Sequence, residues 1–397
     1  MKTALAPMAT LSHEALRLLI HRWGDPDEYF SEMINASTFV AGGKFEHWYV
    51  RSAPCPERMV WQLTGASPES LSKAASLLAR EGGIGVDINM GCSAPDIAKT
   101  GAGVAWMGKP LSEVAEMVGG VRRALDTAGA ATPRRLSVKL RLGENEDEKR
   151  LLEFCRTLVS EGVELITLHP RIRRDKYSRP ARPSFVGALA SSLPVPVYGN
   201  GDISNASDAL SYAQSWPCAG IMIGRAAVRT PWIFGDIQRA AAAVPADRTV
   251  SADLTVPADR AASADRTASA DRTVPADRTV PADRTVPADR AVPADRTVPA
   301  DSSASAADAA CAGTSVTAAD PYRDHLEIAD FFLATLVQCQ PPEFHISRAR
   351  RFFFYYCENF VFAHHIKMKI QNAQTPDEIR GLLRRYFEEV PQDRFRR

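Results

Sequence analysis

The sequence carries almost no net charge and has no closely paired cysteines. Its 48 Lys and Arg side chains are balanced by 47 Asp and Glu, which leaves a formal charge of +1. No global field therefore attracts a polyanion, and any contact with nucleic acid must be local. The seven cysteines are scattered, and none stands in a Cys-x-x-Cys pair, which argues against a disulfide framework and against a zinc site. We expect a protein of the reducing cytoplasm that binds no metal.

Long apolar runs are missing as well. No stretch approaches the roughly 18 apolar residues that a membrane-spanning helix needs. The first twenty residues are interrupted by Pro7, Ser12 and His13, so they do not form the apolar region of a signal peptide. With 45% hydrophobic and 24% charged residues, the composition suits a globular protein. We expect no contact with a membrane, and a monomer.

A hexad repeat, VPADRT and its variants, interrupts the chain from Val244 to about Ser303. Its copies contain charged residues, Pro or Ser and no aromatic residue, so burial cannot offset the entropy lost on ordering. We therefore predict a first domain at 1–243, a disordered linker at 244–320 and a second domain at 321–397. A binding repeat or a small solenoid is the alternative interpretation of the hexads.

Residues 1–243 alternate short β-rich runs with amphipathic helical patterns. The β-rich runs lie near 3–8, 29–34, 59–65, 86–91, 136–143, 164–170, 195–202 and 220–226. Eight such units in a domain of this size are typical of a TIM (β/α)8 barrel. A doubly wound open sheet is the alternative, but the Gly-x-Gly-x-x-Gly turn that usually follows its first strand is absent. Residues 321–397 predict three helices, at 325–339, 347–371 and 375–390, and no strand.

Polar residues stand at the carboxyl ends of the predicted strands, where the active site of a TIM barrel lies. They are Gln62, Asn89, Lys139, Arg141, His169, Asn200 and Arg225. Each could instead cap a loop or pair with a neighbouring charge. The glycines in GNGD and GRA, Gly201 and Gly224, allow backbone amides to approach a phosphate closely, although they could simply form tight turns.

Cys92 follows the fourth predicted strand in a loop of small residues. We expect its thiol to be exposed at the mouth of the barrel. A thiol of ordinary pKa, about 8.5, is mostly protonated at neutral pH and can donate a proton. The alternative is a small apolar side chain that fills space.

Several segments follow one another in a distinctive order. They are APMATLSHEALR, QLTG, DINMGC with GAGVAWMGKP, VKLRLG, LHPRIRRDKY, NGD and MIGRAAVRTPWIF. Their order and spacing resemble the tRNA-dihydrouridine synthase family across nearly all of 1–243, and HISRARRFFFYYCENF looks like a helix of that family's RNA-binding domain. The resemblance implies an FMN-dependent enzyme that reduces the C5=C6 bond of selected uridines in tRNA, with NADPH or NADH as the electron donor.

The resemblance also implies roles for single residues. Hydride would pass from the flavin to uracil C6 while Cys92 protonates C5. The implied FMN-binding residues are Pro7, Met8, Gln62, Lys139, His169, Asn200, Gly201, Asp202, Gly224 and Arg225. The implied substrate contacts are Asn89 and Arg141 for uracil and Arg348, Arg350 and Arg351 for RNA. Aromatic residues at helical spacing are usually core, so most rings of 352–356 are expected to face inward.

The chain departs from the family pattern in several places. The family's usual Gly, Thr and Asp of the first motif are Thr10, Ser12 and His13, and a usual Gly in the loop after the sixth strand is Arg179. Family members usually read Gly-Cys-Pro after the fourth strand, whereas here Ser93 and Ala94 separate Cys92 from Pro95. The family also enters its helical domain almost directly from the barrel, so the hexads are an insertion. Two other functions stay open at this stage: an FMN barrel that acts on a small pyrimidine, and an RNA-binding barrel without catalysis.

Overall fold

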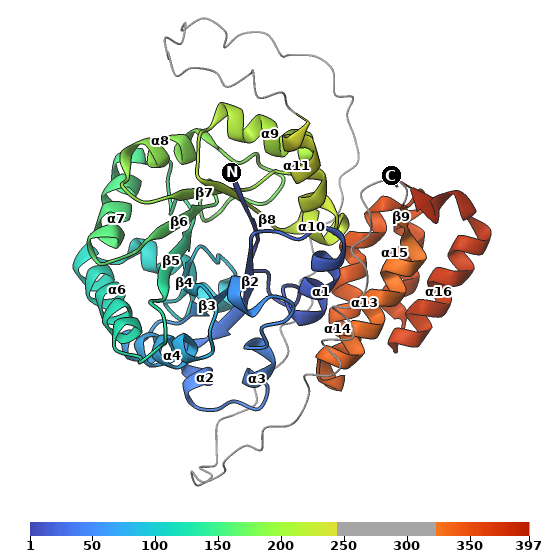
Figure 1. The fold of residues 1–397 in the computed structure, drawn as a ribbon, viewed down its shortest axis with the longest axis horizontal. Helices are drawn as coiled ribbons and strands as arrows, with labels where there is room; N and C mark the ends of the chain where they lie inside the picture. Colours follow the sequence, from blue (N-terminus) through green and yellow to red (C-terminus); the bar gives the residue numbers. More distant parts are fainter. Residues whose placement is uncertain (244–322, 397) are drawn as a thin grey trace, which may run out of the picture. The chain divides into compact units, whose positions relative to one another are not determined.

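A closed parallel β-barrel forms the first part of the chain (Figure 1). The computed structural model describes residues 1–243 and 323–396, so the predicted linker at 244–320 lies outside the described residues. The strands are β1 (Lys2–Leu5), β2 (Glu28–Asn35), β3 (Met59–Thr64), β4 (Gly85–Met90), β5 (Arg135–Leu140), β6 (Leu165–Leu168), β7 (Val197–Asn200) and β8 (Gly220–Ile223). Each strand pairs with the next in chain order, and β1 closes the barrel by pairing with β8.

Helices follow the strands and surround the barrel (Figure 1). They are α1 (Glu14–Trp23), α2 (Ala36–Val40), α3 (Glu46–Tyr49), α4 (Pro68–Arg80), α5 (Pro95–Ala98), α6 (Leu111–Asp126), α7 (Glu148–Ser160), α8 (Ser184–Ser192), α9 (Ala206–Ser215), α10 (Arg225–Arg229) and α11 (Ile233–Ala242). Local signals set their ends: the Ser67 hydroxyl accepts a hydrogen bond from the Ser70 amide at 3.1 Å and caps α4. The predicted TIM barrel is confirmed.

The C-terminal part is helical, with one helix more than predicted. It contains α13 (His325–Cys339), α14 (Pro342–Tyr356), α15 (Ala363–Asn372) and α16 (Pro376–Glu389), and the two-residue strands β9 (Arg323–Asp324) and β10 (Phe395–Arg396) pair with each other. The single helix expected at 347–371 and the absence of strands were therefore wrong. Phe360 adopts an extended conformation, and its ring packs 5.5 Å from that of Tyr386 and 5.3 Å from that of Phe387. Burying this ring interrupts the helical path between α14 and α15.

Helix α13 packs directly against α1, so the barrel and the C-terminal helices belong to one compact unit (Figure 1). Arg22 pairs with Glu327 at 2.8 Å. The rings of Trp23 and Phe331 meet edge to face, with their centroids 5.3 Å apart. Aromatic edge-to-face contacts of this kind stabilise beyond the area that they bury.

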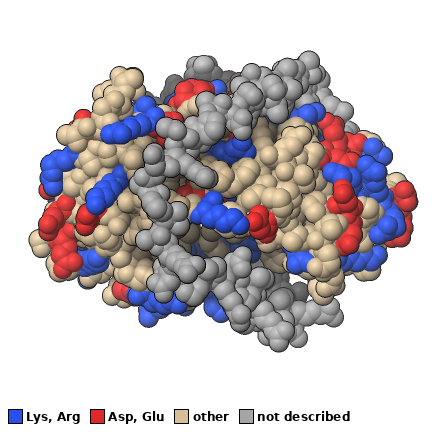
Figure 2. Space-filling view, turned by 90° about the horizontal axis from the view of Figure 1, so that it is seen from below, with Lys and Arg blue, Asp and Glu red and all other residues tan. Residues whose placement is uncertain are grey.

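The surface charge is mixed. On the face that Figure 2 displays, Lys and Arg alternate with Asp and Glu and form no continuous basic field. Among residues 1–243 and 323–396, no helix combines the length and the apolar character needed to cross a bilayer.

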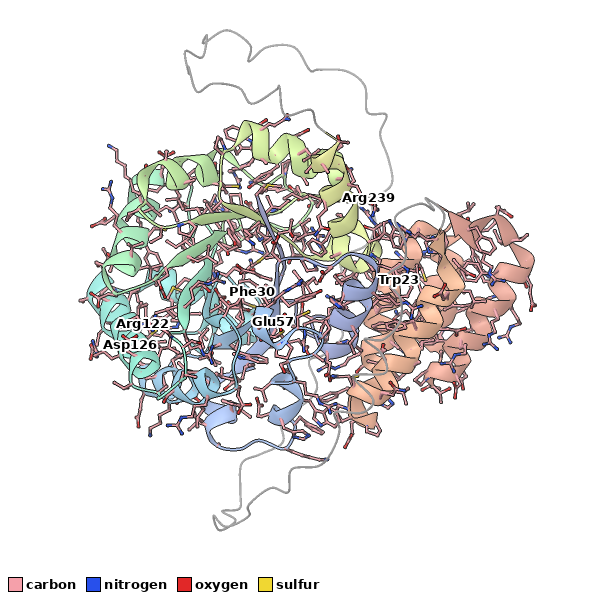
Figure 3. All side chains as sticks on the ribbon, viewed as in Figure 1. Trp23, Phe30, Glu57, Arg122, Asp126 and Arg239 are labelled. Atoms are coloured by element: carbon pink, nitrogen blue, oxygen red, sulfur yellow. The ribbon has the colours of Figure 1, made fainter. Side chains whose placement is uncertain are left out.

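The barrel interior is filled by side chains. Phe30, which Figure 3 labels inside the barrel, packs there with Val60, Leu165, Tyr198 and Met222. Below this layer the guanidinium of Arg135 donates to both carboxylate oxygens of Glu28, at 2.9 and 2.7 Å. The Tyr198 hydroxyl donates to the same carboxylate at 3.1 Å. Side chains of the described residues thus fill this part of the barrel interior.

Candidate active site

A cavity of about 290 Å³ lies at the carboxyl ends of the strands. The predicted residues that line it are Pro7, Met8, Lys139, His169, Asn200, Gly201, Asp202, Gly224 and Arg225. They come from β1, β5, β6, β7 and β8 or from the loops after them, and the barrel brings them together as the strand-end argument expected. Gln62 does not line this cavity and is fully buried inside the barrel.

The cavity carries more positive than negative charge. Lys139, Arg171, Arg225 and Arg229 line it, together with the carboxylates of Asp202 and Glu358. Both carboxylates are already paired, because Asp202 accepts from Arg171 at 2.6 Å and Glu358 accepts from Lys367 at 3.2 Å. The unmatched cations make the cavity suitable for an anionic ligand.

His169 is held as a neutral imidazole. The Nη1 group of Arg171 lies 2.9 Å from His169 Nε2. A guanidinium has no acceptor, so Nε2 must accept this hydrogen bond and the proton resides on Nδ1. Burial, followed by the charges of Lys139 and Arg141, lowers the pKa of His169, which agrees with the neutral form. Sequence reasoning missed Arg171, although it stands two residues beyond His169 in the motif LHPRIRRDKY.

The ammonium group of Lys139 has a lowered pKa. Burial, followed by the charge of Arg141, lowers the pKa of Lys139 to about 8, while Asp87 and Cys92 oppose this shift. Such an ammonium is charged at neutral pH and is available to balance negative charge that develops in the cavity.

Tyr177 lies across one side of the cavity. Its ring stacks on that of His169 with an interplanar angle of 16°, and the guanidinium of Arg225 lies 3.8 Å from the ring centroid. The side chain is 56% exposed. Its position depends on the loop after β6, and no periodicity in the sequence signals it.

Gly201 and Gly224 line the cavity where neighbouring side chains leave little space for a Cβ. Gly201 has a φ of +119°, and a Cβ there would lie 3.0 Å from Cδ2 of His169. A Cβ at Gly224 would lie 3.3 Å from the sulfur of Met8. Both positions thus favour glycine, and because both residues line the cavity without a side chain, a ligand there can come close to their backbone.

The backbone amide and the backbone carbonyl of Cys92 both form hydrogen bonds within the protein. The Cys92 amide donates to Oδ1 of Asn89 at 2.9 Å, and the Cys92 carbonyl accepts from Val104 at 3.0 Å. Pro95 begins α5, so the displaced proline serves as the first residue of a helix. The thiol is half-buried, and its charge, when ionised, would raise the pKa values of Lys139 and Arg141. Cys92 therefore lies close to the two cations.

The predicted uracil contacts lie beside this loop. Asn89 is buried, and its Nδ2 donates to Oε1 of Gln62 at 2.9 Å. Arg141 is largely buried and donates to the carbonyl of Ile172 at 3.3 Å. Neither residue lines the main cavity.

The three arginines predicted to contact RNA have different surroundings. Arg348 is buried and pairs with Glu32 of β2 at 2.5 Å, so its guanidinium already has a partner inside the protein. Arg350 is half-buried and donates to the carbonyl of Ala373 at 3.1 Å. Arg351 is exposed. Most rings of 352–356 face inward as expected, since Phe352, Phe353 and Tyr356 are buried.

One group of metal-ligand side chains lies apart from the cavity. His21, Asp25 and Cys55 place one ligand atom each within 4.8 Å of the others. Asp25 already accepts from Arg58 at 2.8 Å and lies 2.9 Å from Nδ1 of His21. The bond to Asp25, followed by that to Cys55, raises the pKa of His21 to about 10. We assign this cluster to an ion-pair network.

Sequence comparison places the chain among known proteins. The profile described as "Dihydrouridine synthase (Dus)" matches residues 4–257. A tRNA-dihydrouridine(47) synthase [NAD(P)(+)]-like protein of Rattus norvegicus is 33% identical over 239 residues, which are 60% of this chain and 36% of that protein. A tRNA-dihydrouridine synthase B of Pseudomonas putida is 28% identical over 234 residues, which are 59% of this chain and 67% of that protein. The match to the rat protein thus spans about a third of that protein's length.

Similarity to solved structures is weaker. A 2-naphthoyl-CoA reductase has a TM-score of 0.46 at 10% identity and covers 60% of this chain and 50% of its own. A morphinone reductase variant has a TM-score of 0.42 at 11% identity and covers 60% of this chain and 87% of its own. Similarity at this level carries no functional information.

Proposed function

Because the chain belongs to the dihydrouridine synthase family, we propose that it reduces the C5=C6 bond of uridines in tRNA to give 5,6-dihydrouridine. FMN is the proposed flavin, and NADPH or NADH the proposed electron donor. The family resemblance read from the motifs is confirmed by the match to residues 4–257. The observation that carries the proposed activity is a half-buried thiol, Cys92, close enough to act electrostatically on Lys139, which lines a cationic cavity at the carboxyl ends of the barrel strands.

The charge of the cavity and the glycines that line it suit FMN. Its volume of about 290 Å³ lies just below the roughly 300–1,000 Å³ usual for small-molecule sites. Gly201, Gly224 and Arg225 would hold the phosphate, because two of them expose backbone and the third supplies charge. Pro7 and Met8 would contact the ring system. The bound flavin would supply the hydride.

The chain's own residues would handle protons and charge. Cys92, as a neutral thiol, would donate a proton to C5 of the uracil, since hydride addition to one carbon of the double bond requires protonation of the other. Lys139 would balance negative charge on the reduced flavin. His169 offers the Nδ1 proton as a hydrogen-bond donor, because Arg171 occupies Nε2. Asn89 and Arg141 would orient the uracil ring.

The C-terminal helices would bind the tRNA. Arg351 and Lys369 are exposed and can neutralise phosphates. Tyr355 and Glu358 of this region line the same cavity as the barrel residues, so RNA held there would lie close to the proposed flavin site. We also propose that the protein acts in the cytoplasm as a monomer. The proposed cytoplasmic location is supported by the cysteines within the described ranges, which are all free thiols.

An anaerobic absorption experiment tests the proposal. Purified protein should show a flavin spectrum that bleaches with NADPH and returns only when unmodified tRNA is added. Reoxidation by a free pyrimidine instead of tRNA would favour a small-molecule oxidoreductase. A protein that tRNA retains but FMN cannot reconstitute would contradict the enzymatic function and favour an RNA-binding barrel.

A further inference from the structure

A continuous chain of buried hydrogen bonds runs from the interior of strand β4 to the Cys92 amide. Nε2 of Gln62 donates to Oδ2 of Asp87 at 2.7 Å, and Oε1 of Gln62 accepts from Nδ2 of Asn89 at 2.9 Å. Oδ1 of Asn89 then accepts from the backbone amides of Cys92 at 2.9 Å and Gly91 at 3.2 Å. Asp87 stands at the start of this chain and is fully buried.

We propose that Asp87 is a positioning residue, whose carboxylate sets the orientation of the Gln62 and Asn89 amides and thereby holds the Cys92 loop in place. Asp87 is the first residue of the segment DINMGC and does not line the cavity. The inference rests on the proposed function only in naming Cys92 as the proton donor.

The order of donors and acceptors in this series of hydrogen bonds follows from the chemistry of Asp87, its first residue. An ionised carboxylate can only accept hydrogen bonds, whereas an amide side chain can turn over and exchange its donor and acceptor. Asp87 therefore requires Gln62 to present its NH2 group inward and its oxygen toward Asn89. Asn89 must then present its NH2 group to Gln62, which leaves its oxygen for the Cys92 amide. The negative charge of Asp87 thus excludes the turned-over orientation of both the Gln62 and the Asn89 side-chain amide.

Asp87 is ionised at pH 8, the pH of the experiment described below. Burial raises its pKa to about 6, and the bonds from Gln62 and Ser137 oppose the shift. The carboxylate is therefore charged at pH 7.5 and above. The Ser137 hydroxyl donates to the other oxygen, Oδ1, at 2.7 Å. That hydrogen bond is not part of the series that leads through Gln62 and Asn89 to Cys92. Replacing Ser137 is therefore a matched control for the loss of one hydrogen bond to Asp87.

The replacement Asp87→Asn keeps the size of the side chain and removes the constraint on direction. An asparagine at this place can offer either an oxygen or an NH2 group to Gln62. If Gln62 turns over, it faces Asn89 with a donor, and Asn89 turns over in its place. The Cys92 amide then faces an NH2 group and loses its acceptor.

The test is the rate at which iodoacetamide alkylates Cys92 in the full-length protein at pH 8, followed by mass spectrometry of the Cys92 peptide. Asp87→Asn should alkylate faster by about threefold or more, the scale of one lost hydrogen bond, whereas Ser137→Ala should match the parent protein. In steady-state assays Asp87→Asn should lower kcat and leave KM for tRNA nearly unchanged. An alkylation rate equal to that of the parent protein would overturn the proposal.

A double variant distinguishes an effect of the amide orientations from an effect of altered packing at position 87. In Asp87→Asn with Gln62→Glu the charge moves to position 62, where the carboxylate again accepts from Asn89 and from the new asparagine. The proposal expects the alkylation rate of Cys92 to return to the parent value. A folded double variant that alkylates faster than the parent protein would contradict it, and because this comparison uses only the parent protein, it holds even if the single variant fails to fold. Because alkylation needs neither flavin nor RNA, failure of the proposed enzymatic function would leave this result readable.

Discussion

Arg348 of α14 and Glu32 of β2 form an ion pair at 2.5 Å in which both side chains are only 4% exposed. The other carboxylate oxygen of Glu32 accepts from the backbone amide of Thr10 at 2.6 Å. Glu32 therefore connects the C-terminal helices to the first loop of the barrel. A buried ion pair costs much to break, because removing one partner leaves the other charge without compensation.

We expect Arg348→Met to lower the free energy of unfolding by about 3–5 kcal/mol. The combined replacement with Glu32→Gln should recover much of this loss, since no buried charge then stays unpaired. Urea denaturation of both variants measures the difference. Arg351→Met is the matched control, because Arg351 is exposed in the same helix and should change stability by about 0.5 kcal/mol or less. Additive losses in the double variant would contradict the pairing.

Replacing Cys92 with alanine should lower the rate of dihydrouridine formation by about 100-fold or more, the usual scale for a lost general acid. FMN absorption should persist, because Cys92 does not line the cavity. Cys218→Ala removes another half-buried thiol and should leave the rate unchanged. Full activity in Cys92→Ala would exclude the thiol as the proton donor.

FMN affinity should depend on pH through Lys139. Its pKa of about 8 belongs to the protein without flavin, and an anionic ligand nearby raises it. The dissociation constant should therefore stay flat below about pH 8 and then increase by up to about tenfold per pH unit, because binding takes up one proton. Lys139→Met should bind FMN more weakly and show no such slope between about pH 7 and 9.5. Fluorescence titration of FMN measures both, and an unchanged slope in the variant would assign the titration to another group.

Arg351→Gln should weaken tRNA binding and reduce the salt dependence of the affinity by about one unit of slope, as expected for one lost phosphate contact. Arg123 is an exposed arginine on the outer barrel helix α6, and Arg123→Gln should leave both quantities unchanged. Filter binding at several salt concentrations distinguishes the two variants. Equal losses in both would indicate a general electrostatic effect without a defined RNA site.

Strand spacing predicts the barrel and most of the cavity, because the carboxyl ends of parallel strands meet at one face. Gln62 shows where this reasoning stops. It stands near the end of β3, but strands of a closed barrel are staggered, and the stagger places its side chain inside the barrel, against Asp87. Arg348 lies in a run of basic and aromatic residues, but its partner Glu32 comes from a distant strand. Such pairings depend on three-dimensional contact and have no local signal.

The filled floor of the barrel limits how molecules can reach the cavity. Phe30, Tyr198 and the Glu28–Arg135 pair close the interior below it, so no second route leads through the barrel. Under the proposed function, the nicotinamide donor and the tRNA would both approach from the carboxyl ends of the strands, where the cavity lies. If they share that approach and exclude each other, the two half-reactions would alternate, and double-reciprocal plots of the rate against one substrate, at several concentrations of the other, would be parallel lines.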